Sequence, residues 1–451
     1  MKFKKAQIPA SLFSSLLIAT LLLVFCLHSN AQETTQIAFP SLDSVFSYTQ
    51  HKSTTLHSGE IKFSQAQKAK LAAIASIIDL NANISLNITD NTKLPVSYFP
   101  AEAFGGTPGT YREIQTGIPY TNNFNQYADI KLLNVSGWQN LKLAKINIES
   151  TTTDNKLSQK SLYENIAATY YNILTLQEQL KSTNKNVATA DTLHQMVKTK
   201  FDAGMSRQQD VNDAEVNFLN TKESASQIQF LIQQQYIAIK ILCDIPDATA
   251  ITIQENIAFN KSTTPTIQLN NLNTTNSLLK EKYAFNNYRQ LKFTILPIIS
   301  AFASNSNQQY SNNFSLVDKN VNWINSNYIG LKAVWQIPSA NTVSQISKAK
   351  YDSQLAKENS EHSKLKSQLD FSQLNIDYEK AVSQFSTNEH TTLLQNDSYK
   401  KNLENYQQGI INLSQLLTSY NAMVNSNYNY ISSAVSVMLM QSKIKINNNI
   451  Q

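Results

Sequence analysis

A glycine-centred turn between two long heptad-like patterns constrains this chain more than any other feature of its sequence. After Gly204, residues spaced alternately by three and four recur from Val211 to Leu242, and most of them are apolar. Such narrow spacing is typical of a coiled-coil seam rather than of the broad apolar face of a globular helix. Glycine tolerates the left-handed residue that ends a helix. The stretch therefore predicts a helical hairpin with its turn at Gly204 and Ser206 as the cap of the second helix.

The same device occurs again 205 residues later, at Gly409. A second seam with the same three-and-four spacing runs from Leu417 to Met438, and an aromatic residue, Phe201 or Tyr406, lies three positions before each glycine. Two matching hairpins at this spacing predict a duplicated chain with halves of about 200 residues.

The amino terminus has the pattern of a secretory signal peptide over residues 1–31. Three lysines precede an apolar stretch, and Ala31 ends a small-x-small cleavage site. A lipoprotein cut before Cys26 is disfavoured because Phe25 is large where a small residue is needed. Removing the segment lowers the formal net charge from +6 to about +3, which is too small and too dispersed for a nucleic-acid interface. Only Cys243 then remains, so no intramolecular disulfide can form.

Strands of period two interrupt the helical patterns. Apolar residues at even positions alternate with polar residues at odd positions in the predicted strand 77–90, and a return strand is predicted at about 122–136. Residues 93–122 between them predict a long structured loop, since they are rich in glycine and proline. About eleven tilted residues match the span of an outer-membrane strand. The sequence then predicts a long helix from Leu141, about 90 Å in length if continuous.

The second half repeats this order, and the repeat defines the predicted domain boundaries. We expect a first repeat at 32–245, a linker at 246–269, a second repeat at 270–445 and a carboxyl-terminal tail at 446–451. Strands are predicted at about 296–305 and 323–337, with a polar loop from 305 to 322 between them. The predicted order of elements in each half is therefore helix, strand, strand, helix, turn and helix.

Four short strands cannot close a barrel alone, and an open sheet edge is not tolerated in lipid. Several copies must therefore contribute strands. Three copies give a twelve-stranded barrel, an even number of the kind observed in outer-membrane proteins. The fold class expected is mainly α with a transmembrane β part, in which long helices pack as a hollow cylinder. The polar strand positions should face a water-filled lumen; they are Asp79, Asn81, Asn83, Asn87, Asp129, Lys131 and Lys332.

The sequence resembles the TolC-like outer membrane efflux and secretion channel family. The resemblance is carried by the tip pattern F-x-x-G-x-x-x-x-x-D-V-x-x-A, by its second-half echo Y-x-x-G, and by IGLKAVWQIPSA at the end of the fourth strand. The residues of these tip patterns are Phe201, Gly204, Asp210, Val211, Ala214, Tyr406 and Gly409. The resemblance implies a homotrimer in the outer membrane of a Gram-negative bacterium, with a helical tunnel in the periplasm. It also implies a periplasmic adaptor protein and an inner-membrane pump of the RND or ABC type as partners.

By position, the resemblance makes the residues around the two turns adaptor-docking tips: Phe201, Gly204, Met205, Tyr406, Gly409 and Ile410. Some relatives narrow the periplasmic mouth with acidic rings and a basic residue after the second-half glycine. This chain has Gln415, Thr418 and Ile411 at those places. Asp210 and Asp213 in the first half remain candidates for the constriction, and they serve equally well as partners of a helix dipole.

Other classes of function find less support. The histidines of the mature chain are scattered, and none pairs with a cysteine or a carboxylate at metal-ligand spacing, so no metal site is expected. Neither a cofactor motif nor a catalytic motif occurs. The chain is therefore expected not to be an enzyme. Efflux of small molecules by passive conduction is the favoured function. The alternatives are the outer component of a type I protein secretion system and, in a different class, a periplasmic coiled-coil adaptor or scaffold.

Overall fold

The structure is a computed structural model, and it describes residues 36–255, 265–314 and 322–450. Its contacts divide the chain into two compact units, each built from both halves of the sequence. Unit 1 comprises residues 1–57, 158–269 and 370–451, and unit 2 comprises residues 58–157 and 270–369. The predicted signal peptide lies outside the described residues.

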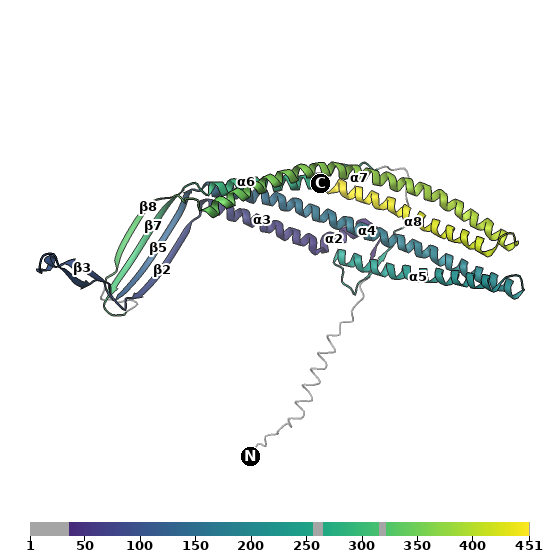
Figure 1. Cartoon of the computed structure of the whole chain (residues 1–451), viewed down its shortest axis with the longest axis horizontal. Coiled ribbons are helices and arrows are strands. Elements are labelled where there is room, and N and C mark those ends of the chain that lie inside the picture. The colour runs from purple at the N-terminus through teal and green to yellow at the C-terminus, as the bar shows by residue number, and fades with distance from the viewer. Residues whose placement is uncertain (1–35, 256–264, 315–321, 451) are drawn as a thin grey trace, which may run out of the picture. The chain divides into compact units, whose positions relative to one another are not determined.

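Four long helices dominate unit 1 and come in matched pairs (Figure 1). Helices α4 (Val135–Asp202) and α7 (Ala340–Gln407) have 68 residues each and also contribute to unit 2. They are followed by α5 (Gln208–Cys243) and α8 (Leu413–Asn449), with 36 and 37 residues. Equal lengths at equal places in the two halves agree with a duplicated chain.

The buried residues of α5 follow the predicted seam, because Val211, Ala214, Ala225, Ile228 and Ile239 all lie in the core. In α8 the buried line near the turn differs from the predicted one. It runs through Leu413, Leu416, Tyr420 and Met423. Of the predicted line, Tyr420, Ala434 and Met438 are buried, whereas Leu417 and Val424 are only partly buried. The two apolar lines share Tyr420, and spacing alone does not tell which of them is the more deeply buried.

A small parallel pairing completes the core of unit 1. Strand β1 (Gln36–Phe39) pairs with β6 (Ala250–Ile253), and Phe39, Ile251 and Ile253 join a hydrophobic cluster with α2 (Leu42–Lys52), α4, α5 and α8. Strand β6 lies within the predicted linker 246–269. Four residues are too few for a periodic signal, and the partner strand lies more than 200 residues away in the chain.

Unit 2 contains a four-stranded antiparallel sheet in the order β2-β5-β7-β8 (Figure 1). Its strands are β2 (Asn81–Asp90), β5 (Tyr120–Leu133), β7 (Ile298–Ser311) and β8 (Ile324–Val334). Most of helix α3 (Thr54–Ile78) and helix α6 (Leu272–Phe293) also belong to this unit. Between β2 and β5 the predicted loop contains a hairpin of β3 (Val96–Pro100) and β4 (Tyr111–Gln115), with the short 3-10 helix η1 (Ala101–Phe104).

All four predicted strands exist, with shifted ends. Strand β2 starts at Asn81 rather than near 77, since α3 continues to Ile78 and Asp79 turns the chain with φ 41°. Strand β5 covers 120–133 rather than 122–136, because α4 begins at Val135. Strand β7 continues to Ser311 although 305–311 is predicted as loop. Residues there are polar on both faces, so alternation gives no signal, yet pairing with β5 and β8 keeps them extended. Strand β8 ends at Val334 rather than 337.

The helix ends also differ from expectation in two places. The long helix α4 starts at Val135 rather than Leu141, so Trp138 lies in its first turn. Helix α8 continues to Asn449 and buries Ile446, whereas 446–451 is predicted as a tail. Among the helices of the described ranges, none has the length and hydrophobicity needed to cross a membrane.

Candidate functional site

The two hairpin turns in unit 1 have the same backbone geometry. Gly204 and Gly409 adopt φ 74° and 75°, in the left-handed region where glycine is favoured. In the first turn, Met205 N donates to Lys200 O at 2.8 Å and Gly204 N donates to Phe201 O at 2.8 Å. These two bonds form a Schellman motif.

The second turn repeats both hydrogen bonds. Ile410 N donates to Asn405 O at 2.8 Å, and Gly409 N donates to Tyr406 O at 3.1 Å. Both glycine positions are open, because a Cβ built on either would meet no atom within 4 Å. The glycines are therefore required by the backbone angle and not by crowding.

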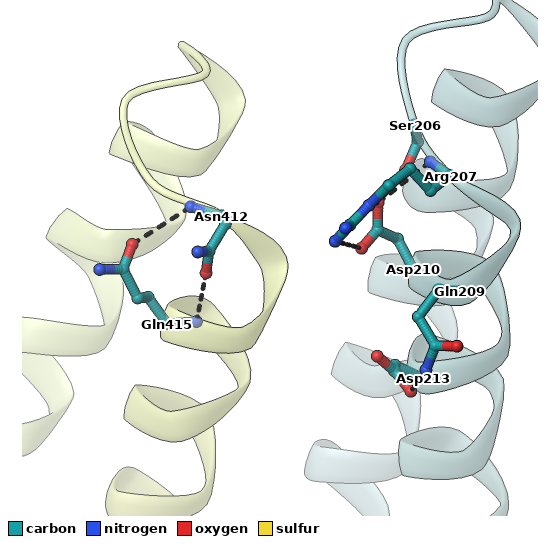
Figure 2. Close-up of polar contacts among 7 residues, drawn as sticks. All are labelled: Ser206, Arg207, Gln209, Asp210, Asp213, Asn412 and Gln415. Carbon is teal, nitrogen blue, oxygen red and sulfur yellow. Dashed lines mark hydrogen bonds and ion pairs between the residues drawn. The ribbon is translucent and has the colours of Figure 1, made fainter.

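The start of the next helix is duplicated as well (Figure 2). The N-cap residue lies three positions after each glycine, at Arg207 and Asn412, and the residue three further on reaches back to it. Gln415 N donates to Asn412 Oδ1 at 2.9 Å and Asn412 N donates to Gln415 Oε1 at 3.2 Å, which is a complete capping box. The predicted cap Ser206 is therefore wrong by one residue.

Asp210 is held by a cluster of donors at the start of α5 (Figure 2). Its carboxylate accepts from Arg207 N and Arg207 Nη2, both at 3.0 Å, and from Ser206 Oγ at 3.2 Å. Hydrogen bonds from the Arg207 side chain, followed by that from the Arg207 backbone N–H, lower the pKa of Asp210. The carboxylate is thus ionised and turned toward its own helix start.

The other predicted constriction residues also bond within their own helices. Asp213 Oδ1 accepts from Gln209 Nε2 at 2.8 Å (Figure 2), and Thr418 Oγ1 donates to Ser414 O at 2.8 Å. Gln415 is the capping partner described above. Each of the four thus has a local hydrogen bond within the first turns of its own helix or to its cap, and their role in a constriction stays a prediction.

The core beneath the turns joins the two hairpins. Val197 of α4, Val211 of α5, Tyr406 of α7 and Leu416 of α8 belong to one buried cluster. Lys200 links the hairpins directly, because its Nζ donates to Tyr406 O at 3.1 Å and lies 4.2 Å from the centroid of the Tyr406 ring. An ammonium at the end of α7 also suits the negative end of that helix dipole. The contact is not predicted from the sequence, although the lysine in the last turn of α4 indicates that a partner at a helix end is present.

Exposure separates the six predicted docking residues. Met205, Ile410 and Phe201 are exposed to 72%, 65% and 37%, whereas Tyr406 is only 6% exposed and supports the core. Burial, together with the charge of Asp210, raises the pKa of the Tyr406 hydroxyl. The surface of the turns therefore presents apolar side chains from both hairpins, and Tyr406 is not part of that surface.

The sheet of unit 2 has two chemically distinct faces. Its apolar face is defined by residues that pair across the strands, as in the row Ala82, Ala128, Ala303 and Ile329; it also includes Ile84, Leu86, Ile88, Ile130, Ala301 and Leu331. The polar face holds the intervening positions. By register, six of the seven predicted lumen residues lie on the polar face: Asn81, Asn83, Asn87, Asp129, Lys131 and Lys332.

The seventh, Asp79, precedes β2 in the left-handed turn and forms an ion pair with Lys131. It is therefore not a strand residue, and the ion pair links it to β5. The lumen itself remains a prediction for all seven.

The apolar face changes character partway along β7 and β8. Asn305, Asn307, Asn325 and Asn327 form a closed ring in which each side-chain amide donates to the next at 2.5 to 2.7 Å. Each amide thereby satisfies part of its hydrogen-bonding capacity on a face that is otherwise apolar. Sequence reasoning misses the ring, because it depends on the register of two strands.

The sequence and the fold are similar to those of known outer membrane proteins. Residues 101–242 match the family model described as outer membrane efflux protein. The whole fold is similar to three solved outer membrane proteins. VceC of Vibrio cholerae has 13% identity and a TM-score of 0.73, with 90% of this chain and 95% of that chain covered. CmeC of Campylobacter jejuni has 14% identity and a TM-score of 0.65, with 90% of this chain and 85% of that chain covered. MtrE of Neisseria gonorrhoeae, in its open state, has 12% identity and a TM-score of 0.69, with 90% of this chain and 88% of that chain covered.

None of the curated proteins matches the sequence. The chain therefore matches the outer membrane efflux protein family over residues 101–242, and its fold is similar to that of solved TolC-like channels. The predicted resemblance and fold class are confirmed at this level.

Proposed function

We propose that the chain is the exit duct of a tripartite efflux pump and conducts small molecules passively across the outer membrane. The observation that carries this proposal is the pair of free edges in the four-stranded sheet. Neighbouring strands are antiparallel throughout the order β2-β5-β7-β8, so the two edge strands, β2 and β8, run in opposite directions. Strand β8 of one copy can therefore extend the sheet antiparallel onto β2 of the next copy.

Repetition of this pairing closes a barrel. Three copies supply twelve strands, which satisfies the backbone hydrogen bonds of both edges in lipid. The apolar face then contacts outer-membrane lipid, and the polar face lines the water-filled lumen. A homotrimer thus agrees with the sheet and with the resemblance to the TolC-like channels.

The exposed tips supply the second part of the proposal. Phe201, Met205 and Ile410 present apolar side chains beside turns whose backbone is fixed by Gly204 and Gly409. A rigid turn with exposed apolar side chains suits docking to a periplasmic adaptor, which would couple the duct to an inner-membrane pump of the RND or ABC type. The pump supplies the energy, and the duct opens by a shift of the tip helices.

Passive conduction needs no catalytic group. The family is one of efflux channels, which supports a role other than that of an enzyme. An elongated coiled-coil adaptor or scaffold has no place for the two-faced sheet of unit 2, so that alternative loses its support. No observation favours protein secretion over efflux of small molecules.

The pairing of β2 with β8 is tested by disulfide crosslinking in membranes. The one cysteine left by signal cleavage, Cys243, is buried, so we expect disulfide bonds to form only between the introduced cysteines. Each β2 position from Asn81 to Asp90 is replaced by cysteine in turn and combined with a cysteine in β8. We expect particular pairs to give covalent oligomers of up to three copies on oxidation.

A cysteine pair at Asn125 and Ser306 is the matched control. These residues face each other within one copy, since Ser306 Oγ donates to Asn125 Oδ1 at 2.5 Å. The control should crosslink inside the chain and remain a single copy on a gel. Absence of oligomers from every β2–β8 combination, with the control oxidised, would refute the proposed assembly.

A further inference from the structure

An aromatic and basic cluster interrupts the polar face of the sheet. Amides and hydroxyls occupy most of that face, but Tyr127 of β5, Phe302 of β7 and Tyr328 of β8 bring three rings together. The Tyr127 and Phe302 rings are stacked with centroids 6.1 Å apart, and the Phe302 and Tyr328 rings meet edge to face, also at 6.1 Å. Tyr328 remains 55% exposed, so the rings offer accessible surface on the face that would line the lumen.

Gly330 makes room for the central ring. It pairs directly with Phe302 across β7 and β8. A Cβ at Gly330 would lie 3.0 Å from both Cε1 and Cζ of Phe302. The ring therefore rests against the backbone of β8, a position that any larger residue at 330 would disturb.

Lys332 gives the cluster a positive charge. Its Nζ donates to Tyr127 Oη at 3.3 Å and lies 5.8 Å from the centroid of the Tyr127 ring. Lys131, at the same level of the sheet on β5, is neutralised by its ion pair with Asp79. Within the residues that the structure describes, Lys332 forms no ion pair, so its charge is available to a ligand.

We propose that Tyr127, Phe302, Tyr328 and Lys332 form a contact site for planar aromatic anions passing through the lumen. The occupant follows from charge and shape: ring faces attract a planar π system, and an unpaired ammonium attracts a carboxylate or sulfonate. A cationic ligand would lose the attraction to Lys332, and an aliphatic anion would lose the stacking contact. The proposal rests on the proposed function, because it requires the polar face to be lined by water.

The obvious alternative is that the rings only stabilise the sheet. Cross-strand aromatic pairs do stabilise neighbouring strands, and a ring over a glycine is a known device for fixing register. Under this alternative, ring removal changes stability but leaves the affinity for an aromatic anion unchanged. The two roles therefore differ in a measurable quantity.

The test is isothermal titration of the full-length mature protein in detergent with 2-naphthalenesulfonate as the probe. Cyclohexanesulfonate, which has the same charge but no π system, serves as the control ligand. We expect Phe302→Leu and Lys332→Met each to weaken binding of the aromatic probe by roughly tenfold, which corresponds to the loss of about one good contact.

Three further variants sharpen the result. Tyr310→Leu removes a ring from β7 outside the cluster and should bind the probe like the unaltered protein. Lys332→Arg should keep the affinity, because the charge is kept. Asp129→Asn removes the negative charge paired across from Phe302 and should strengthen binding.

Equal affinities for the two sulfonates, or affinities unaltered by Phe302→Leu and Lys332→Met in variants that remain folded, would overturn the inference. The conductance of the same preparations in planar bilayers is recorded in parallel. Conduction without cluster-dependent binding rejects only the contact site, whereas a protein that neither oligomerises nor conducts rejects the proposed function itself.

Discussion

Replacement of either turn glycine by alanine tests the duplicated geometry in depth. Gly204 and Gly409 have φ of 74° and 75°, and a Cβ at either position would contact nothing within 4 Å. The cost of Gly204→Ala or Gly409→Ala is therefore the backbone cost alone. A left-handed residue with a Cβ costs roughly 1–2 kcal/mol, and we expect the two variants to lose the same amount.

The assay is hydrogen exchange at the two amides that close the turns. Met205 N and Ile410 N each donate at 2.8 Å to the last turn of the preceding helix. When local opening controls exchange, a loss of 1–2 kcal/mol accelerates it by roughly 5- to 30-fold. Asparagine tolerates the left-handed region better than alanine. Hydrogen exchange should therefore be accelerated less in Gly204→Asn and Gly409→Asn than in the alanine variants.

Two results would refute this reasoning. Exchange at Met205 that is unchanged in Gly204→Ala would show that the turn does not need the left-handed residue. A large effect at one glycine and none at the other would show that the two turns are not equivalent. The unaltered turn in each single variant is the internal control, since it should exchange at the original rate.

Three other predictions concern groups near the turns. Tyr420→Phe removes a hydroxyl that donates at 2.9 Å to a backbone carbonyl, and should lower the free energy of unfolding by about 0.5–1.5 kcal/mol in urea titrations. Tyr399→Phe removes a buried hydroxyl that has no hydrogen-bond partner among the described residues, and this change should be neutral or stabilising. Equal losses of stability in the two variants would contradict these contacts. Because the folded pKa of Asp210 is depressed, its carboxylate stabilises the fold above its unfolded pKa of about 3.9, and this contribution is lost as the pH falls through the folded pKa. The variant Asp210→Asn should therefore lower the Tm at pH 7 but not at strongly acid pH, and a Tm deficit that persists in acid would count against the ion pair. Lys200→Met should loosen the junction between the hairpins and speed proteolysis at the turns, whereas Lys198→Met, at an exposed position of the same helix turn, should leave cleavage unchanged.

Local chemistry explains why much of the fold could be predicted from the sequence. Gly204 and Gly409 mark their turns because the left-handed conformation leaves few alternatives to glycine. The apolar positions of β2 identify that strand, since one of its faces is apolar and the other polar. In these places a single residue or a short period carries the whole signal.

What sequence reasoning misses depends on partners distant in the chain. Strand β6 exists because β1 pairs with it, and neither has a periodic pattern of its own. The end of β7 is polar on both faces, so only its pairing with β5 and β8 identifies it as a strand.

The same limit applies to side-chain contacts. The link between Lys200 and Tyr406 connects the two hairpins, and the cluster around Phe302 requires the register with Gly330. Neither contact can be read from the spacing of residues within one helix or one strand.

The mass of the detergent-solubilised mature protein, measured by light scattering with the detergent contribution subtracted, tests the central claim most directly. The edge strands β2 and β8 require neighbours, so the account predicts a particle three times the mass of one mature chain. A monodisperse single copy that stays dissolved after the detergent is removed would contradict it.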